Sequence, residues 1–168
     1  MKAGFLASAA FALALISIPA QAAPEWTSIL MEKVVDRTPD QTWAKIGGYC
    51  TIDTWLKVTC VVTTGNQVSV GTIRRLNGKT DEIIVAATPY SYSYAQPLTD
   101  VQPESPIFYH GTLAVEPLDR GRKTKIVYTL FYDQAPLNTT EAKIANREQR
   151  TKRFTEALDT MKSMAEAP

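Results

Sequence analysis

Three tyrosines at alternate positions, Tyr90, Tyr92 and Tyr94, are the most distinctive chemical feature of the sequence. In a β-strand, alternate side chains point to the same face, so the three rings would form one broad aromatic surface. A tyrosine buries a large apolar ring and keeps a hydroxyl group that needs a hydrogen-bond partner. Two interpretations follow: a packed face of a sheet, or the wall of a pocket for a small molecule.

Arg74 could add charge to such a surface. It shares a strand face with Thr72 and Leu76 by alternation. If that face is inward, the guanidinium group is expensive to bury unless it meets an anion, a carbonyl or tyrosine hydroxyls. With a tyrosine it could polarise a substrate carbonyl, or it could only anchor a ligand. Asp81 and Glu82 stand at a strand start, and we expect both to be solvated turn residues.

His110 is the one histidine of the sequence and thus the first candidate for acid–base catalysis at neutral pH. Alternation places its side chain on the face opposite Tyr109 and Leu113, so it faces solvent if those residues face a cavity. The sequence contains no G-x-S-x-G motif and no glycine-rich phosphate loop. We therefore assign no catalytic residue and no cofactor.

The first 22 residues have the parts of a secretory signal peptide. Lys2 gives a short basic start, an apolar run extends over residues 3–18, and small residues precede a cleavage position after Ala22. The run is short for a membrane span, so we expect no stable membrane anchor. These features predict a periplasmic or secreted protein in which residues 23–168 form a single domain.

The chain after residue 22 carries no net formal charge. The 18 basic residues include Lys2, which leaves 17 basic against 17 acidic residues. Nucleic acids and anionic membrane surfaces attract clustered positive charge, so we expect neither as the main partner.

Cys50 and Cys60 are the only cysteines. An even number of cysteines in an exported chain favours a disulfide, which would close a short loop and stabilise the fold by about 2–3 kcal/mol. The alternative is two buried thiols that only fill space. A metal site is not expected, because there is no Cys-x-x-Cys spacing and only His110 could assist.

The elements that would position these residues begin with a strand over residues 26–35. Thr38-Pro39-Asp40 then begins a short helix, because threonine is a good N-cap and proline suits the first helical position. Gly47-Gly48 ends that helix, and a second short helix is predicted at 51–56.

Six further strands follow, separated by turn residues such as Gly65-Asn66 and Asn77-Gly78. They are predicted at 58–64, 68–76, 82–87, 89–97, 107–117 and 123–133. In the last of them Ile126, Tyr128 and Leu130 share the face that we expect to point inward.

A long polar helix is predicted from Thr139 or Thr140 to about Ala165. One face of it carries an apolar stripe made of Ile144, Thr151, Phe154, Leu158, Met161 and Ala165. Such a helix must lie against an apolar surface, and the concave face of the sheet is the one that the chain offers.

This order of elements resembles the helix-grip fold of the START-related superfamily, which includes polyketide cyclase/dehydrase-like and birch-pollen-allergen-like proteins. The segments that carry the resemblance are Thr38–Trp43, Trp55, Gly71–Leu76, Tyr90–Tyr94, Tyr109–Pro117 and Thr124–Tyr128. It implies an α+β fold in which a curved antiparallel sheet of about seven strands wraps around the long C-terminal helix, with two short helices after the first strand.

The resemblance also implies a cavity between the sheet and the last helix for a hydrophobic or aromatic small molecule. The residues expected to bind that ligand are Arg74, Leu76, Tyr90, Tyr92, Tyr94, Tyr109, Tyr128, Phe154 and Leu158. A binding or carrier protein is the first functional hypothesis. The alternatives are a cyclase/dehydratase-type enzyme that uses the same cavity, and a ligand-free accessory protein that binds a protein partner.

Overall fold

Seven antiparallel strands form one sheet in the order β1-β7-β6-β5-β4-β3-β2. The computed structural model describes residues 23–66, 68–97 and 108–168, so the predicted signal peptide lies outside the described residues. The strands are β1 (Trp26–Val35), β2 (Cys60–Thr64), β3 (Ile73–Leu76), β4 (Thr80–Thr88), β5 (Ser91–Gln96), β6 (Tyr109–Leu118) and β7 (Lys123–Asp133). This sheet confirms the predicted α+β architecture.

The strands β2 to β7 form a meander in which each pairs with the next, whereas β1 joins the free edge of β7. The register of that edge pair runs from Trp26 opposite Asp133 to Val35 opposite Thr124. The first strand therefore completes a sheet that the rest of the chain builds.

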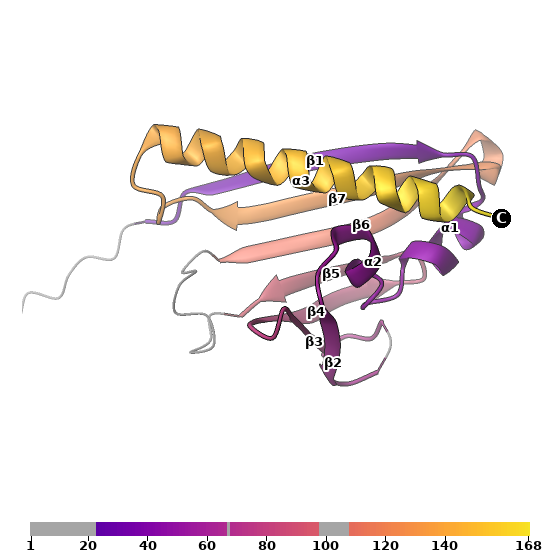
Figure 1. Ribbon diagram of the computed structural model, residues 1–168, viewed down its shortest axis with the longest axis horizontal. Coiled ribbons are helices and arrows are strands. Elements are labelled where there is room, and N and C mark those ends of the chain that lie inside the picture. The colour runs from indigo at the N-terminus through magenta and orange to yellow at the C-terminus, as the bar shows by residue number, and fades with distance from the viewer. Residues whose placement is uncertain (1–22, 67, 98–107) are drawn as a thin grey trace, which may run out of the picture.

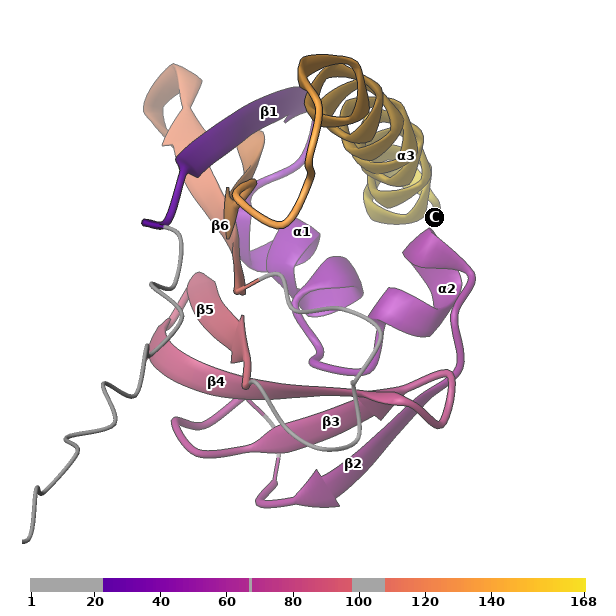
Figure 2. The ribbon, with the colours of Figure 1, turned by 90° about the vertical axis from the view of Figure 1, so that its left-hand side faces the viewer.

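The sheet curves around its inner face (Figure 2). Irregularities interrupt the pairing of β4 between Ile84 and Ala86, and the pairing of β2 between Val62 and Thr64. An extra residue in one strand bends that strand and increases its local twist. The curvature lets the inner face surround the helices instead of lying flat beneath them.

Two short helices, α1 (Pro39–Ile46) and α2 (Ile52–Leu56), follow β1 and lie inside this curve (Figure 2). A capping box begins α1: the Thr38 hydroxyl accepts from the backbone N–H of Gln41 at 3.3 Å, and the Gln41 side chain accepts from the backbone N–H of Thr38 at 3.1 Å. The Trp55 side chain of α2 is almost fully buried. Both helices agree with the sequence prediction.

The long helix α3 (Thr140–Glu166) runs lengthwise beside β1 and also contacts α1 and α2 (Figure 1). Its N-cap is Thr139, whose hydroxyl accepts from the backbone N–H of Ala142 at 3.1 Å. The buried side chains of α3 are Phe154, Ala157, Leu158, Met161 and Ala165. No helix within the described ranges is both long and apolar enough to cross a membrane.

The predicted apolar stripe of α3 is wrong at its N-terminal end, because Ile144 is 53% exposed. A repeat of seven residues falls short of two full helical turns by about 20°. Leu158 stands two heptads after Ile144, so the two side chains diverge by about 40° around the helix. Ile144 thus lies outside the buried face.

The strand predicted at 68–76 is also shorter than expected, since β3 begins at Ile73. The backbone N–H of Thr72 bonds to the carbonyl of Ser69 at 3.0 Å, which closes a turn. Gly71 in this turn has a φ of +87°, a conformation that interrupts an extended chain and that glycine adopts readily.

Candidate functional site

Tyrosine rings fill the centre of the inner face of the sheet. Tyr92 and Tyr94 of β5, Tyr109 of β6, and Tyr128 and Tyr132 of β7 are all buried. Ring centroids are 6.4 Å apart between Tyr92 and Tyr94, and 6.2 Å apart between Tyr94 and Tyr109. These separations fall in the range of favourable aromatic pairs. The tyrosine strand is therefore first of all a packed surface.

The Tyr94 ring passes over Gly111, its partner on β6. A side-chain carbon at Gly111 would overlap that ring, so only glycine leaves room for it. Beyond Gly111 the hydroxyls of Tyr94 and Tyr128 share a hydrogen bond of 2.8 Å. Burial raises the pKa of both tyrosines well above the usual value, so both hydroxyls keep their protons at neutral pH.

Arg74 of β3 is fully buried beside these rings. Its Nε and Nη2 donate to the same Glu82 oxygen, at 2.8 and 2.6 Å, and its Nη1 donates to the carbonyl of Tyr49. Its guanidinium carbon lies 4.1 Å from the ring centroid of Tyr49 and 5.0 Å from that of Tyr94. Burial opposes the charge, but Glu82 and the tyrosines outweigh it and raise the pKa of Arg74, which stays a cation.

Glu82 is not the solvated turn residue that the sequence suggests, because only 2% of it is exposed. It lies directly opposite Arg74 in the β3–β4 pair. Its second carboxylate oxygen accepts a hydrogen bond from the Gln96 side chain at 2.9 Å. A buried charge requires such partners. The neighbouring Asp81 instead pairs with Arg75 in a less buried position, through bonds of 2.7 and 2.8 Å.

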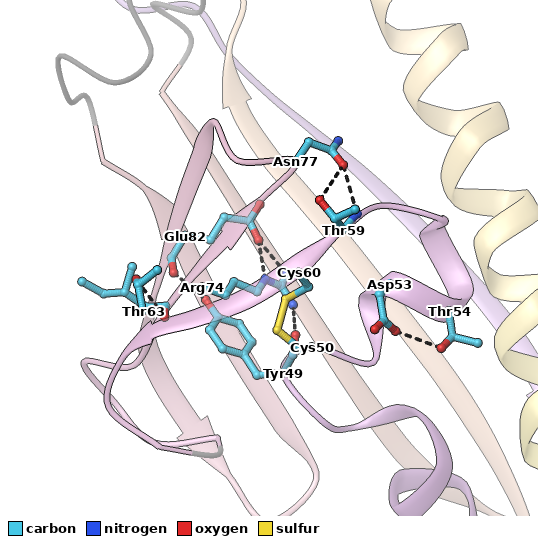
Figure 3. The surroundings of a disulfide bond; sticks show 11 residues. Tyr49, Cys50, Asp53, Thr54, Thr59, Cys60, Thr63, Arg74, Asn77 and Glu82 are labelled. Atoms are coloured by element: carbon cyan, nitrogen blue, oxygen red, sulfur yellow. Dashed lines mark hydrogen bonds and ion pairs between the residues drawn. A yellow bond between two sulfur atoms is a disulfide. The ribbon is translucent and has the colours of Figure 1, made fainter.

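A disulfide joins Cys50 to Cys60 and confirms the predicted pairing. Figure 3 shows that this bond lies beside Tyr49 and Arg74. Tyr49 immediately precedes Cys50, and its hydroxyl donates to the backbone carbonyl of Glu82 at 2.9 Å. Cys60 begins β2 at the edge of the sheet. The disulfide thus ties the segment that covers the buried ion pair to the sheet itself.

Next to the ion pair, a cavity of about 150 Å³ lies between the sheet, α2 and α3. Its buried lining residues are Ile52, Val58, Leu76, Glu82, Tyr94, Tyr109 and Phe154. Its more exposed lining residues, which surround the mouth, are Leu56, Asn77, Thr80, Gln96, Arg150 and Arg153. Six of the seven buried lining residues are thus apolar or aromatic and the seventh is the charged Glu82, whereas the residues at the mouth are mostly polar and include two arginines.

The structure brings four of the predicted ligand-binding residues to this cavity: Leu76, Tyr94, Tyr109 and Phe154. Four others are buried in the surrounding core: Arg74, Tyr92, Tyr128 and Leu158. The Tyr128 ring lies 4.8 Å from that of Phe154 and so supports the cavity wall. Tyr90 precedes β5, where its hydroxyl donates to the carboxylate of Asp40 at the surface.

Sequence reasoning missed five residues of this region: Tyr49, Glu82, Gln96, Arg150 and Arg153. Alternation from Tyr92 and Tyr94 does place Gln96 on the inner face. Arg150 stands four positions before Phe154 and therefore on the same side of α3. Tyr49 lies in a loop, where no periodicity indicates a direction.

His110 lies on the outer face of the sheet, as alternation predicts. Its ring centroid is 4.7 Å from that of Phe108 and 6.3 Å from that of Phe131. Burial lowers the pKa of His110 below its ordinary value of 6.5. Within the described part of the chain, no group of three His, Cys, Asp or Glu side chains is placed to hold a metal ion.

Solved structures share this fold. A protein from Nitrosospira multiformis superposes with a TM-score of 0.61 at 22% identity, covering 82% of this chain and 94% of its own. Ara h 8.0201 gives 0.56 at 15% identity, covering 83% and 99%. A norcoclaurine synthase point mutant from Thalictrum flavum, in complex with a transition-state analogue, gives 0.59 at 16% identity, covering 86% and 97%.

No curated protein sequence matches the chain significantly. The sequence profile described as polyketide cyclase / dehydrase and lipid transport, however, matches residues 27–166. That match begins at the second residue of β1 and ends at the last residue of α3, and the superpositions agree with it in fold. The chain therefore belongs to the polyketide cyclase / dehydrase and lipid transport family, within the helix-grip superfamily that the sequence resembles.

Proposed function

We propose that this protein binds a small hydrophobic or aromatic molecule in the cavity between the sheet, α2 and α3, and that it does so after export from the cytoplasm. The observation that carries the proposal is the cavity itself, whose interior is walled by Leu76, Tyr109 and Phe154. Apolar walls with a few polar groups are typical of small-molecule sites. The family description, which includes lipid transport, supports a hydrophobic ligand.

The walls of the cavity are held in place before any ligand arrives. The Tyr94–Tyr128 hydrogen bond fixes one wall, and the ion pair of Arg74 with Glu82 fixes another. A preorganised site loses little conformational entropy on binding, which favours affinity for a small ligand. This rigidity suits a binding protein.

Export is inferred from the signal-peptide pattern of residues 1–22. The Cys50–Cys60 disulfide supports it, because disulfides persist in oxidising compartments such as the periplasm. The test is N-terminal sequencing of the protein recovered from a periplasmic fraction. A first residue of Ala23 is expected, and a protein that retains Met1 in the cytoplasm would contradict export.

Ligand binding is tested by native mass spectrometry of the protein purified from its own host. A co-purifying small molecule is expected on the wild type. A Leu56→Trp variant puts a larger side chain at the half-buried mouth and should lose that molecule. Val61→Trp, at a position that is 62% exposed on β2, is the matched control and should retain it.

The two variants also separate specific from superficial binding. A molecule that is lost equally from Leu56→Trp and Val61→Trp does not occupy the cavity. If the wild type carries no adduct and gains none from an extract of its host, the binding function is contradicted.

A further inference from the structure

The size of the cavity limits its occupant. Its volume of about 150 Å³ is below the ~300–1,000 Å³ of most sites for drug-sized ligands. It equals the ~150 Å³ of an apolar protein cavity that admits benzene. One six-membered ring therefore fits inside, whereas a long acyl chain does not.

The charge at the mouth is supplied by α3. Arg150 and Arg153 stand about one helical turn apart and line the same cavity. Neither is in a salt bridge with a carboxylate of the described residues. Among the residues that the structure describes, the cavity mouth thus presents two cations without a carboxylate in salt-bridge contact.

Arg150 is held in position by its surroundings. Its guanidinium carbon lies 5.0 Å from the ring centroid of Tyr109 and 4.6 Å from that of Tyr132. Its Nε donates to the Asn146 side chain at 2.8 Å, which leaves the two terminal nitrogens for another acceptor. A guanidinium fixed in this way is a preorganised partner for a planar anion.

We propose that the ligand is a single-ring carboxylic acid, bound as its anion with the ring inside the cavity and the carboxylate on Arg150 and Arg153. This inference rests on the proposed binding function and names the chemistry of its ligand. Guanidinium donors match the spacing of carboxylate oxygens and form charge-assisted hydrogen bonds with them. The aromatic interior and the cationic mouth thereby recognise the two halves of one molecule.

Glu82 sets the orientation of that molecule. Its carboxylate is buried in the cavity wall and already accepts hydrogen bonds from Arg74 and Gln96. A second carboxylate placed next to it would be repelled. The acid group of the ligand therefore stays at the mouth, and its ring lies against Leu76 and Phe154.

The experiment is an NMR titration, detected on the ligand, of the chain from Ala23 with benzoate and with benzyl alcohol at neutral pH and low ionic strength. The two probes share one ring and are similar in size, but only benzoate is charged. We expect benzoate to bind about tenfold more tightly or better, which is the effect of at least one charge-assisted hydrogen bond.

Two single-charge variants test the role of the mouth. Arg153→Gln removes an exposed charge and should weaken benzoate binding about tenfold without affecting benzyl alcohol. Lys152→Gln also removes one positive charge, but from the preceding position of α3, where the side chain lies beside Ile144 and does not line the cavity. It should change benzoate affinity less than about twofold, because the high dielectric constant of water weakens the effect of an exposed charge that does not contact the ligand.

The possible results separate this inference from the function on which it rests. Equal affinity for both probes, with no effect of Arg153→Gln, would overturn the acid preference and leave small-molecule binding intact. Decanoate that binds as tightly as benzoate would overturn the size limit. If neither ring compound nor decanoate binds at millimolar concentration, the binding function itself fails.

Discussion

The buried pair of Arg74 and Glu82 has a natural control one residue away. In the same β3–β4 hairpin, Arg75 pairs with Asp81 through two bonds of similar length. The side chains of the first pair are 0% and 3% exposed, and those of the second pair are 39% and 16% exposed. Residue types and strand positions are nearly the same, so burial is the main difference.

Removing one partner should therefore have very different effects at the two sites. Glu82→Gln leaves the Arg74 charge without a counterion in the core, which typically costs about 3–5 kcal/mol of folding free energy. Asp81→Asn breaks a partly solvated pair and should cost only about 0.2–1 kcal/mol. With a urea dependence of about 2 kcal/mol per molar, the unfolding midpoint should fall by about 2 M in the first variant and by at most about 0.5 M in the second.

A double-mutant cycle separates the pair interaction from the loss of packing. Arg74→Met alone should be as damaging as Glu82→Gln alone, but the double variant should cost less than the sum, because no unpaired charge remains. We expect a coupling of about 2 kcal/mol or more for this pair and less than about 1 kcal/mol for Arg75 with Asp81.

The measurement is urea unfolding followed by circular dichroism, with the disulfide intact in every variant. Equal midpoint shifts for Glu82→Gln and Asp81→Asn would refute the reasoning, since burial would then not decide the cost. An additive cycle at the buried pair would refute it too, because it would show that the two charges do not depend on each other.

Three further substitutions test neighbouring parts of the structure. Gly111→Ala should be destabilising by about 1–3 kcal/mol or more, because the new methyl group overlaps the Tyr94 ring; a thermal unfolding temperature equal to that of the wild type would contradict this packing. The Tyr92 hydroxyl is buried without a hydrogen-bond partner in the described part of the chain, so Tyr92→Phe should leave the urea midpoint unchanged or raise it, and a clear fall would mean that the hydroxyl is bonded after all. Burial lowers the pKa of His110 in the folded protein, so the unfolded chain binds its proton first and stability falls as the pH is lowered through about 6.5. In the His110→Gln variant, the free energy of unfolding should therefore fall less between about pH 7.5 and about pH 5.5 than in the wild type. An equal fall in both proteins would exclude a contribution from this residue.

The elements were predictable from the sequence wherever alternation and end signals agreed. β7 matches its predicted bounds, and alternation correctly places Ile126, Tyr128 and Leu130 together on its buried face. The helix α1 also matches its predicted bounds, because Thr38 and Pro39 mark its start. Both signals are local, so no knowledge of the tertiary structure is needed to read them.

The polar part of the site was not predictable to the same degree. Parity showed that Arg74 needs an anion if its strand face points inward, and Glu82 is the residue directly opposite it. The pairing of Arg74 with Glu82 depends on the register of the β3–β4 hairpin. In the structure Leu76 pairs with Thr80 across a three-residue loop. A two-residue Asn77-Gly78 turn would instead pair Leu76 with Lys79 and shift every later residue by one position. One position of register decides whether Glu82 faces the core.

The position of β1 has a consequence for how the chain folds. Within the described sheet β1 pairs with β7 alone, so Trp26 pairs with Asp133 and Val35 with Thr124, residues that are separated by most of the chain length. Contacts between such distant residues require large loops to close and make folding slow. When the chain becomes available from its N-terminus onward, as in synthesis or export, β1 is exposed without its partner strand until β7 has also been released. Throughout that interval the unpaired strand, with its apolar Leu30 and Val34, is open to association with other chains.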